Sequence, residues 1–264
     1  MLQAVKNQLR VTIKTIKYGL MREMINKTSF IMNIVFMILN NASLIIQWIV
    51  IYSLKEDVGG YTFNQVLLLW AIAASTYGFS HFIFKKSYSL SDVITNGKLD
   101  SFLVQPKNVL ISVITTDIEV SALGDILYGY IVLVLSGVTL TKFLLFTLFS
   151  MTGAIVITDI AVLLGSLSFW FGKSDMIADT GNSLMTNFAT YPDGIFKGIS
   201  RILLLTVIPV GLTSYFPVLI MAEFNLMLTL VILFITVILT TLTFIVFYKG
   251  LRRYSSSNLM ISKI

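Results

Sequence analysis

Two aspartates stand within otherwise apolar stretches of the sequence, Asp125 in the run 121–140 and Asp159 in the run 143–164. An ionisable side chain inside a membrane-spanning helix is costly to bury, so it is a functional candidate by default. Two hypotheses follow for this pair of acids. Each carboxyl holds the fold together through a hydrogen bond, or the two handle a substrate or protons near the inner side of the membrane.

Other residues that could do chemistry lack the partners they need. Ser80 and His81 are adjacent, so on a helix their side chains point about 100° apart and cannot pair as nucleophile and base. The tripeptide GKS at 172–174 resembles the end of a phosphate-binding loop, but Leu167 stands where that loop requires glycine. With one histidine and no cysteine, we expect no metal site and no catalytic residues. We therefore predict that the chain is not an enzyme.

The composition excludes an ordinary soluble domain. Hydrophobic residues make up 56% of the 264 residues and charged residues only 12%, whereas soluble domains carry about a quarter charged residues. The net charge of +6 is then typical of inner loops that meet anionic lipid headgroups. We see no basic surface domain of the kind that binds nucleic acid. The sequence predicts an all-α, polytopic membrane protein.

Residues 1–27 have the spacing of an amphipathic helix. Apolar side chains from Leu2 to Met24 recur every three or four residues, and basic ones such as Lys6 and Arg10 recur in the same way on another face. This pattern favours a helix lying in the cytoplasmic membrane interface. The alternative is a helix that packs on a soluble partner.

The lengths of the uncharged stretches predict six spans, because a helix needs about 20 apolar residues to cross. Four spans are expected at 28–54, 58–84, 121–140 and 143–164. The stretch 202–248 contains no lysine or arginine and is too long for one span, so it must cross twice. Pro209 and Pro217 fall near its turning point, where we expect an outer re-entrant hairpin at about 209–223. The alternative is a simple proline kink in each of two long helices.

The distribution of positive charge predicts the orientation. Seventeen of the nineteen Lys and Arg residues fall on one side of these spans, and only Lys55 and Lys142 fall on the other. The rich side is cytoplasmic by the positive-inside rule. Residues 28–250 then form one transmembrane domain with inner loops at 85–108 and 172–198, followed by a cytoplasmic tail at 251–264. We expect a multi-pass protein of a bacterial cytoplasmic membrane with both termini inside.

The loop sequence NGKLDSFLVQPKN resembles the first inner loop of permease subunits in the second class of bacterial ABC exporters (ABC-2 type), the six-span, daunorubicin-exporter-like permeases. The matching residues are Gly97, Leu99, Asp100, Leu103 and Pro106. Farther on, the matching residues are Tyr191, Pro192, Arg201, Pro209 and Pro217, and GLRRYSSS at 250–257 resembles the family's tail. The resemblance covers nearly the whole chain in the right order.

The resemblance implies a permease that pairs with a second permease subunit, as a homodimer or a heterodimer. Two copies of a cytoplasmic ABC ATPase would bind beneath the pair and use ATP and Mg, so this chain itself would bind no cofactor. The first inner loop would hold a short coupling helix that docks on the ATPase. A helix beginning at Ser89 or Ser91 and ending at Gly97 fits that role. The docking residues would be Asp92, Val93, Ile94, Gly97, Leu99, Asp100, Leu103 and Pro106.

For the second half of the chain, the resemblance implies a gating or structural role. The residues concerned are Tyr191, Pro192, Arg201, Pro209 and Pro217. Family members move drugs, antibiotics, peptides and lipids. Two other functions remain open. The chain could be an ion-coupled secondary transporter that uses Asp125 and Asp159, or a scaffold or immunity protein that transports nothing.

Overall fold

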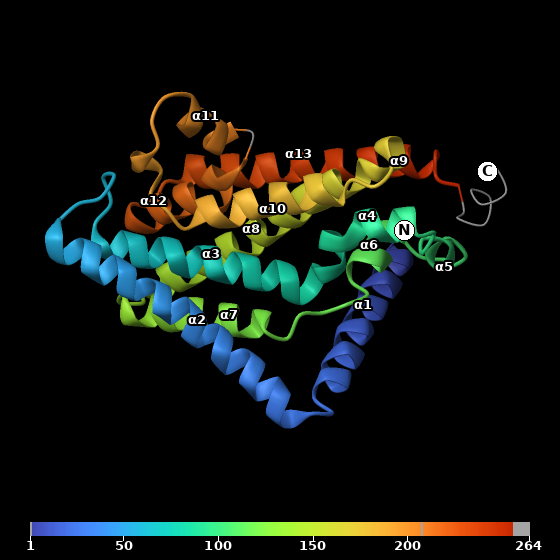
Figure 1. Ribbon diagram of the computed structural model, residues 1–264, viewed down its shortest axis with the longest axis horizontal. Coiled ribbons are helices and arrows are strands. Elements are labelled where there is room, and N and C mark those ends of the chain that lie inside the picture. Colours follow the sequence, from blue (N-terminus) through green and yellow to red (C-terminus); the bar gives the residue numbers. More distant parts are fainter. Residues whose placement is uncertain (1, 207, 256–264) are drawn as a thin grey trace.

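The computed structural model describes residues 2–206 and 208–255, and these residues form helices joined by turns (Figure 1). The longer helices are α1 (Leu2–Glu23), α2 (Lys27–Leu54), α3 (Phe63–Phe84), α7 (Ala122–Leu135), α8 (Leu140–Ser166), α10 (Asp175–Ala189) and α13 (Leu226–Leu251). The shorter ones are α4 (Leu90–Thr95), α5 (Asp100–Leu103), α6 (Val109–Ile114), α9 (Ser168–Phe171), α11 (Ile199–Thr206) and α12 (Phe216–Ala222). The prediction of an all-α protein is confirmed. The predicted tail 251–264 lies outside the described residues beyond Ser255.

Four helical segments of the described chain are long and apolar enough to cross a membrane, so the protein is polytopic. They are Lys27–Leu54, Phe63–Thr95, Leu140–Phe171 and Leu226–Leu251. A fifth is reached if the bent pair α11 and 211–222 forms one span. The predicted third span at 121–140 is shorter than expected. Helix α7 has 14 residues, about 21 Å at 1.5 Å per residue, whereas the hydrocarbon layer is about 30 Å thick.

Polar residues just before the long helices explain where these helices begin. Asn26, Thr139 and Asn225 each accept a hydrogen bond from a backbone N–H in the first turn of α2, α8 and α13. Thr62 and Gln65 form a reciprocal capping box at the start of α3. These caps satisfy backbone donors that have no partner within the helix. The predicted second span at 58–84 therefore starts only at Phe63, after a turn that caps it.

Helix α3 lies at the centre of the bundle and is buried along most of its length against α7 and α8. Small residues allow its close approach to α7. A side chain at Gly129 would come within 2.0 Å of Ser75 Oγ and 2.5 Å of the Ala71 carbonyl oxygen. A side chain at Gly78 would come within 2.8 Å of the Ala122 carbonyl oxygen. Such small-residue contacts are how helices pack closely in a membrane.

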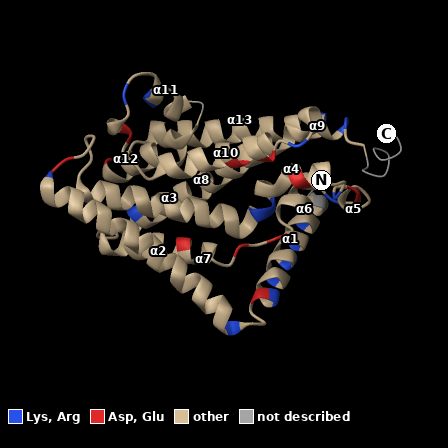
Figure 2. Cartoon of the chain, viewed as in Figure 1, with Lys and Arg blue, Asp and Glu red and all other residues tan. Residues whose placement is uncertain are grey.

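Helix α1 leaves the bundle and forms a V with α2 (Figure 1). Its apolar residues Val5, Leu9 and Ile13 are all more than half exposed. Lysines and arginines follow this helix and gather at the end of the bundle that holds α4–α6, while the long helices carry few charges (Figure 2). The structure thus has a helix at Leu2–Glu23, within the predicted range 1–27. Its place in the membrane interface stays a prediction.

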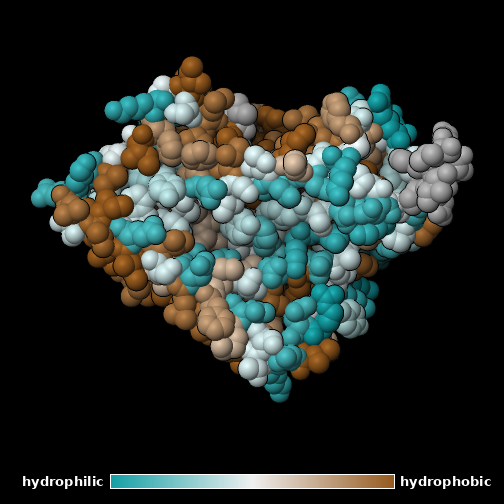
Figure 3. All heavy atoms as spheres, in the orientation of Figure 1, coloured by the Kyte–Doolittle hydropathy of each residue, from teal (hydrophilic) through white to brown (hydrophobic). Residues whose placement is uncertain are grey.

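The outward faces of the long helices are apolar, as Figure 3 shows by the brown areas on the drawn face. Helix α2 is the extreme case. In the most apolar 18 residues of α2, only 11% are buried inside the chain. The same share is 22% in α13 and 61% in the segment that contains α3. In a membrane, such faces meet lipid or another protein chain.

The proline-rich region folds into a bent helical pair. Helix α11 and the segment 211–222 are inclined by 70° to each other, with Pro209 in the break. The segment begins with a π-helical turn, Gly211–Tyr215, and continues as α12 with Pro217 in its first turn. Proline is tolerated there, because its missing N–H would have no intrahelical partner. The bend fits a re-entrant segment or a broken span.

Candidate functional site

The predicted first inner loop, 85–108, is a compact helical unit and not an open loop. A 3₁₀ turn, Lys85–Ser89, leads into α4, and Gly97 follows that helix with φ +70°. The Lys98 N–H bonds to the Val93 carbonyl, and the Gly97 N–H to that of Ile94. This is the glycine-ended helix stop that the sequence predicted.

The unit is held by an apolar core that includes three of the predicted docking residues. Val93, Ile94 and Leu99 are 1%, 6% and 0% exposed. They pack with α6 and with the C-terminal parts of α8 and α13, through residues such as Val162 and Phe247. These three residues therefore face the protein's own interior and cannot be surface contacts for a partner in this conformation.

The surface that remains for docking lies on α5 and the turn after it. Leu103 is 43% exposed and Val104 is 84% exposed, and Pro106 is exposed beside them. Asp92 lies at the rim, where its carboxylate binds the Lys98 ammonium at 2.7 Å. The predicted docking set thus separates into buried supporting residues and a small apolar surface with a charged edge.

Two further contacts tie this unit to the rest of the same end of the bundle, which we call the inner end because of its predicted orientation. Asp100 accepts a hydrogen bond from the Tyr254 hydroxyl at 2.9 Å, which joins α5 to the chain just after α13. Ser91 of α4 accepts bonds from the Ser168 hydroxyl at 2.6 Å and from the Ser174 N–H at 3.2 Å. The first inner loop is therefore attached to the segment that follows α8.

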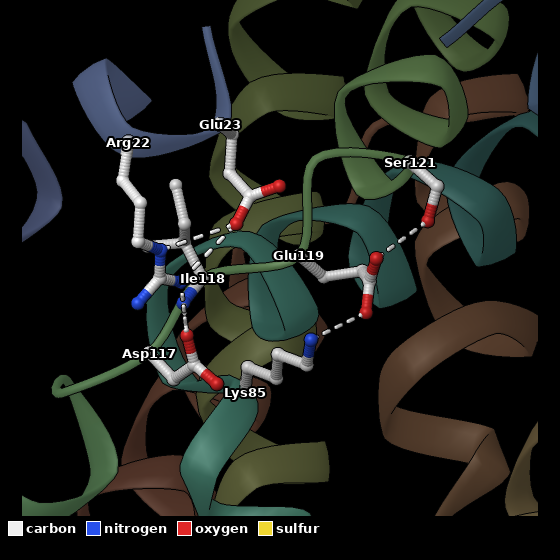
Figure 4. Close-up of polar contacts among 7 residues, drawn as sticks. All are labelled: Arg22, Glu23, Lys85, Asp117, Ile118, Glu119 and Ser121. Carbon is white, nitrogen blue, oxygen red and sulfur yellow. Dashed lines mark hydrogen bonds and ion pairs between the residues drawn. The ribbon is translucent and has the colours of Figure 1, made fainter. Parts of the chain in front are cut away.

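The end of α1 is attached to the connection between α6 and α7 by the contacts in Figure 4. Arg22 binds Asp117 at 2.9 Å, and Lys85, just after α3, binds Glu119 at 2.8 Å. Glu119 also accepts a hydrogen bond from Ser121 at 3.1 Å. Burial opposes ionisation of Asp117, but the bond from Arg22 and the charge of Lys85 outweigh it and hold its pKa below the usual value.

Asp193 organises the opposite end of the bundle. Its carboxylate accepts a hydrogen bond from the Tyr61 hydroxyl at 2.8 Å and two from the Arg201 guanidinium, at 2.6 and 3.0 Å. Burial, and then the neighbouring carboxylate, raises the pKa of Tyr61, so the phenol remains a donor. Nearby, the Tyr191 ring packs edge-on against Trp48 with centroids 6.0 Å apart, and Pro192 is buried.

These contacts correct the predicted topology. The range 172–198 was expected to be one inner loop, but it contains α10, which packs on α8 and α3. After α10, Asp193 and Gly194 reach Tyr61 and Gly59, in the turn that was expected on the outer side. The two predictions cannot both hold. The sequence signal failed because α10 is amphipathic and polar on one side, so it was not counted among the apolar stretches.

A cavity of about 310 Å³ opens between α2, α3, α7 and α10, and Asp125 lines it. Asn41 of α2 donates a hydrogen bond to Asp125 Oδ1 at 2.6 Å. The residues that line this cavity are Met37, Asn40, Asn41, Leu44, Trp70, Ala73, Ala74, Thr76, Tyr77, Asp125, Ile157, Thr186, Asn187, Ala189, Thr190 and Ser214. Asparagines 40 and 41, inside an apolar run, were the sequence signal that could have pointed here.

Asp159 has a different environment. It is 5% exposed and accepts a hydrogen bond from Thr240 of α13 at 2.6 Å, and it is not among the residues that line the cavity. The two acids therefore have different partners on different helices. For Asp159, the bond to Thr240 favours the structural hypothesis.

A second cavity of about 400 Å³ adjoins the first and shares Tyr77, Thr186 and Asn187 with it. His81 also lines this second cavity. Its imidazole ring stacks on the rings of Tyr77 and Tyr88, with centroid distances of 3.8 and 3.9 Å. The described residues 2–206 and 208–255 contain no cluster of three or more His, Cys, Asp or Glu side chains that could hold a metal ion.

Residues 37–258 match the family described as ABC-2 family transporter protein. The match covers most of the chain and includes the helical unit at 85–108, both cavities and the contacts of Asp193. The chain belongs to the ABC-2 transporter family. No curated protein and no solved structure matches it. The family assigns it the part of a membrane permease subunit in an ABC transporter, whose ATPase is typically a separate subunit.

Proposed function

We propose that this chain is the permease subunit of an ATP-driven exporter of the daunorubicin-exporter-like kind. It pairs with a second, identical or related permease and is driven by two cytoplasmic ATPase subunits that use ATP and Mg. The family match over residues 37–258 carries the proposal. The braced helical unit at 85–108, with Leu103 and Val104 exposed at its surface, supports it as the place where an ATPase docks.

In this proposal the chain crosses the membrane six times, through α2, α3, α7, α8, α10 and α13. Helix α10 becomes the fifth pass, with its polar side chains turned to the two cavities and away from lipid. Residues 190–225 then form the outer hairpin that helps to gate the exit, fixed by the bonds of Asp193 to Tyr61 and Arg201. Lys197 and Arg201 move to the outer side, and the positive excess inside still sets the same orientation.

The same proposal places the chain in a bacterial cytoplasmic membrane with both ends inside. Helix α1 lies in the inner interface, where Val5, Leu9 and Ile13 enter the lipid and the basic face meets anionic headgroups. The exposed apolar face of α2 is available to the second permease or to lipid.

The test is a mild-detergent pull-down of the tagged chain from its native membrane, with ATP hydrolysis measured on the eluate. We expect an ATPase subunit to co-elute, and to be lost in Leu103→Glu and Val104→Glu. Both residues are exposed, so these variants fold, whereas changes at Val93, Ile94 or Leu99 would damage the core. The matched control is Leu54→Glu. Leu54 is an exposed leucine at the C-terminal end of α2, which is predicted to lie on the outer side, so this variant should keep the ATPase.

Elution of the chain alone, together with transport driven by an ion gradient, would contradict the proposal. It would favour the ion-coupled secondary transporter, with Asp125 as the residue to examine. Retention of the ATPase by Leu103→Glu and Val104→Glu would move the docking surface elsewhere on the inner side.

A further inference from the structure

We propose that the cavity between α2, α3, α7 and α10 binds a protonated amine carried on an apolar body, with the Asp125 carboxylate accepting the ammonium group. As the site of an exported substrate, this inference rests on the proposed function. As a binding site, it rests on the cavity alone.

The charge of the cavity favours a cation. Asp125 lines the first cavity and Asp179 the second, and no lysine or arginine is among the described residues that line either one. The partner of Asp125 is the neutral amide of Asn41, which also bonds to the Met37 carbonyl. A carboxylate in such a place is stabilised when a cation reaches it, because the low dielectric strengthens their attraction.

Unsatisfied polar atoms point to the same place. Among the described residues, seven buried side-chain atoms have no hydrogen-bond partner. Three of them belong to residues that line the first cavity, Trp70, Thr76 and Ser214, and a fourth belongs to Asn182, which lines the second. Thr76 and Ser214 are 1% and 0% exposed. Buried polar groups normally find partners, and four of these seven unpaired atoms belong to residues that line the two cavities.

The rest of the wall suits an apolar body. Met37, Leu44 and Ile157 line the cavity beside the Trp70 ring, and an aromatic face also attracts a cation. The volume of about 310 Å³, continued by the 400 Å³ of the adjoining cavity, falls in the range of small-molecule sites, about 300–1,000 Å³. Hydrophilic side chains also cross the middle of the face drawn in Figure 3, between apolar areas.

The test uses the purified full chain in lipid nanodiscs without any ATPase. The probe is dansylcadaverine, a fluorescent primary amine, and its uncharged N-acetyl derivative is the matched ligand. Binding is followed by energy transfer from Trp70 in a background where Trp48 and Trp170 are replaced by phenylalanine. We expect saturable binding of the amine, and binding of the N-acetyl derivative at least about tenfold weaker.

Three variants separate a site from a general structural effect. Asp125→Asn should weaken amine binding about tenfold or more and make the two ligands similar. Asp159→Asn is the matched control, because Asp159 is equally buried but does not line the cavity, and it should leave affinity unchanged. Ser214→Ala removes a hydroxyl that has no partner among the described residues and is closed off from the cavity, so it should fold normally and leave the affinity for the amine unchanged.

Equal binding of the two ligands, or equal losses in Asp125→Asn and Asp159→Asn, would overturn the inference. If Asp125→Asn does not fold, equal binding of the amine and its N-acetyl derivative by the chain with Asp125 in place would overturn the inference alone. Because no ATPase is present, these results are independent of the pull-down. Amine binding without a co-eluting ATPase would contradict the proposed exporter but support the binding site. A co-eluting ATPase without amine binding would support the exporter but contradict the binding site.

Discussion

Buried hydroxyls differ in their hydrogen bonding between the inner end of the bundle and the cavity that Asp125 lines. At the inner end, Ser91, Ser168 and Ser174 bond to one another, with oxygen atoms 2.6 to 2.7 Å apart for the two hydroxyl pairs. Around the cavity, Thr76 and Ser214 have no partner in the described chain. Ser166, near the inner end, is also unpaired, so the contrast belongs to the serine cluster and the cavity.

The serine cluster therefore stabilises one arrangement of its segments, whereas the unpaired hydroxyls at the cavity do not. Satisfied buried polar groups fix one conformation, whereas an unsatisfied one costs the free energy of its lost hydration. The serine cluster joins the unit at 85–108 to the segment after α8 through such hydrogen bonds. In the wall of the cavity, the unpaired hydroxyls of Thr76 and Ser214 contribute no such bonds.

The largest effect is expected from Gly129→Val, which tests the close contact between α3 and α7, two of the helices that line the cavity. The new Cβ would meet Ser75 Oγ and the Ala71 carbonyl oxygen, and backbone cannot give way as a flexible side chain can. We expect a loss of about 3 kcal/mol or more in the free energy of unfolding, or no folded protein. Thermal unfolding in detergent measures it. Leu127→Ala, at a half-exposed site on the same helix, is the control, and equal stability of the two variants would show that α3 and α7 can separate.

A paired comparison of two serines sharpens the contrast directly. Ser91→Ala leaves the Ser174 N–H and a hydroxyl of the cluster without their acceptor, which should cost about 1–3 kcal/mol. Ser214→Ala removes a hydroxyl that has no partner and should be neutral or slightly stabilising. Both residues are almost fully buried, so the cavity left by the missing oxygen is similar. Equal losses in denaturant unfolding would mean that the contrast has no energetic content.

The sequence predicted the all-α membrane fold, the amphipathic α1 and the helix stop at Gly97, because each depends on local pattern. The prediction from sequence did not identify α10 as a helix that packs in the bundle. The polar residues with which α10 lines the two cavities lower its mean hydropathy, so it does not stand out as an apolar stretch. The prediction from sequence also placed Val93, Ile94 and Leu99 on a docking surface. Their burial depends on α8 and α13, which are far away in the sequence, and no local pattern reports it.

The candidate site shows the same limit. Asp125 could be selected from the sequence, since an acid in an apolar run is conspicuous. Its separation from Asp159 could not, because it depends on which helices pack together. Asn41 and Thr240, which bond to the two acids, come from opposite ends of the chain.

The smallest effect is expected at the ion pair that attaches α1, which tests whether the inner end is rigid only in its core. The pKa of Asp117 is lowered in the folded protein, so the pair stabilises above the unfolded value of about 3.9 and is lost as pH falls through the folded value. Arg22 is 59% exposed and Asp117 32%, so solvent screening limits the contribution to about 0.2–1 kcal/mol, and salt should weaken it.

Asp117→Asn should remove that acid-side loss and its salt dependence, while Glu56→Gln, in the exposed turn at the other end, should change neither. Hydrogen exchange of the α1 amides at pH 3 to 7 measures both variants. Faster exchange in Asp117→Asn that is confined to the last turns of α1 would show that the pair fixes the end of the helix only. Faster exchange that spreads to α4 would show that the attachment of α1 and the serine cluster form one cooperative unit, and the contrast would then extend to the whole inner end.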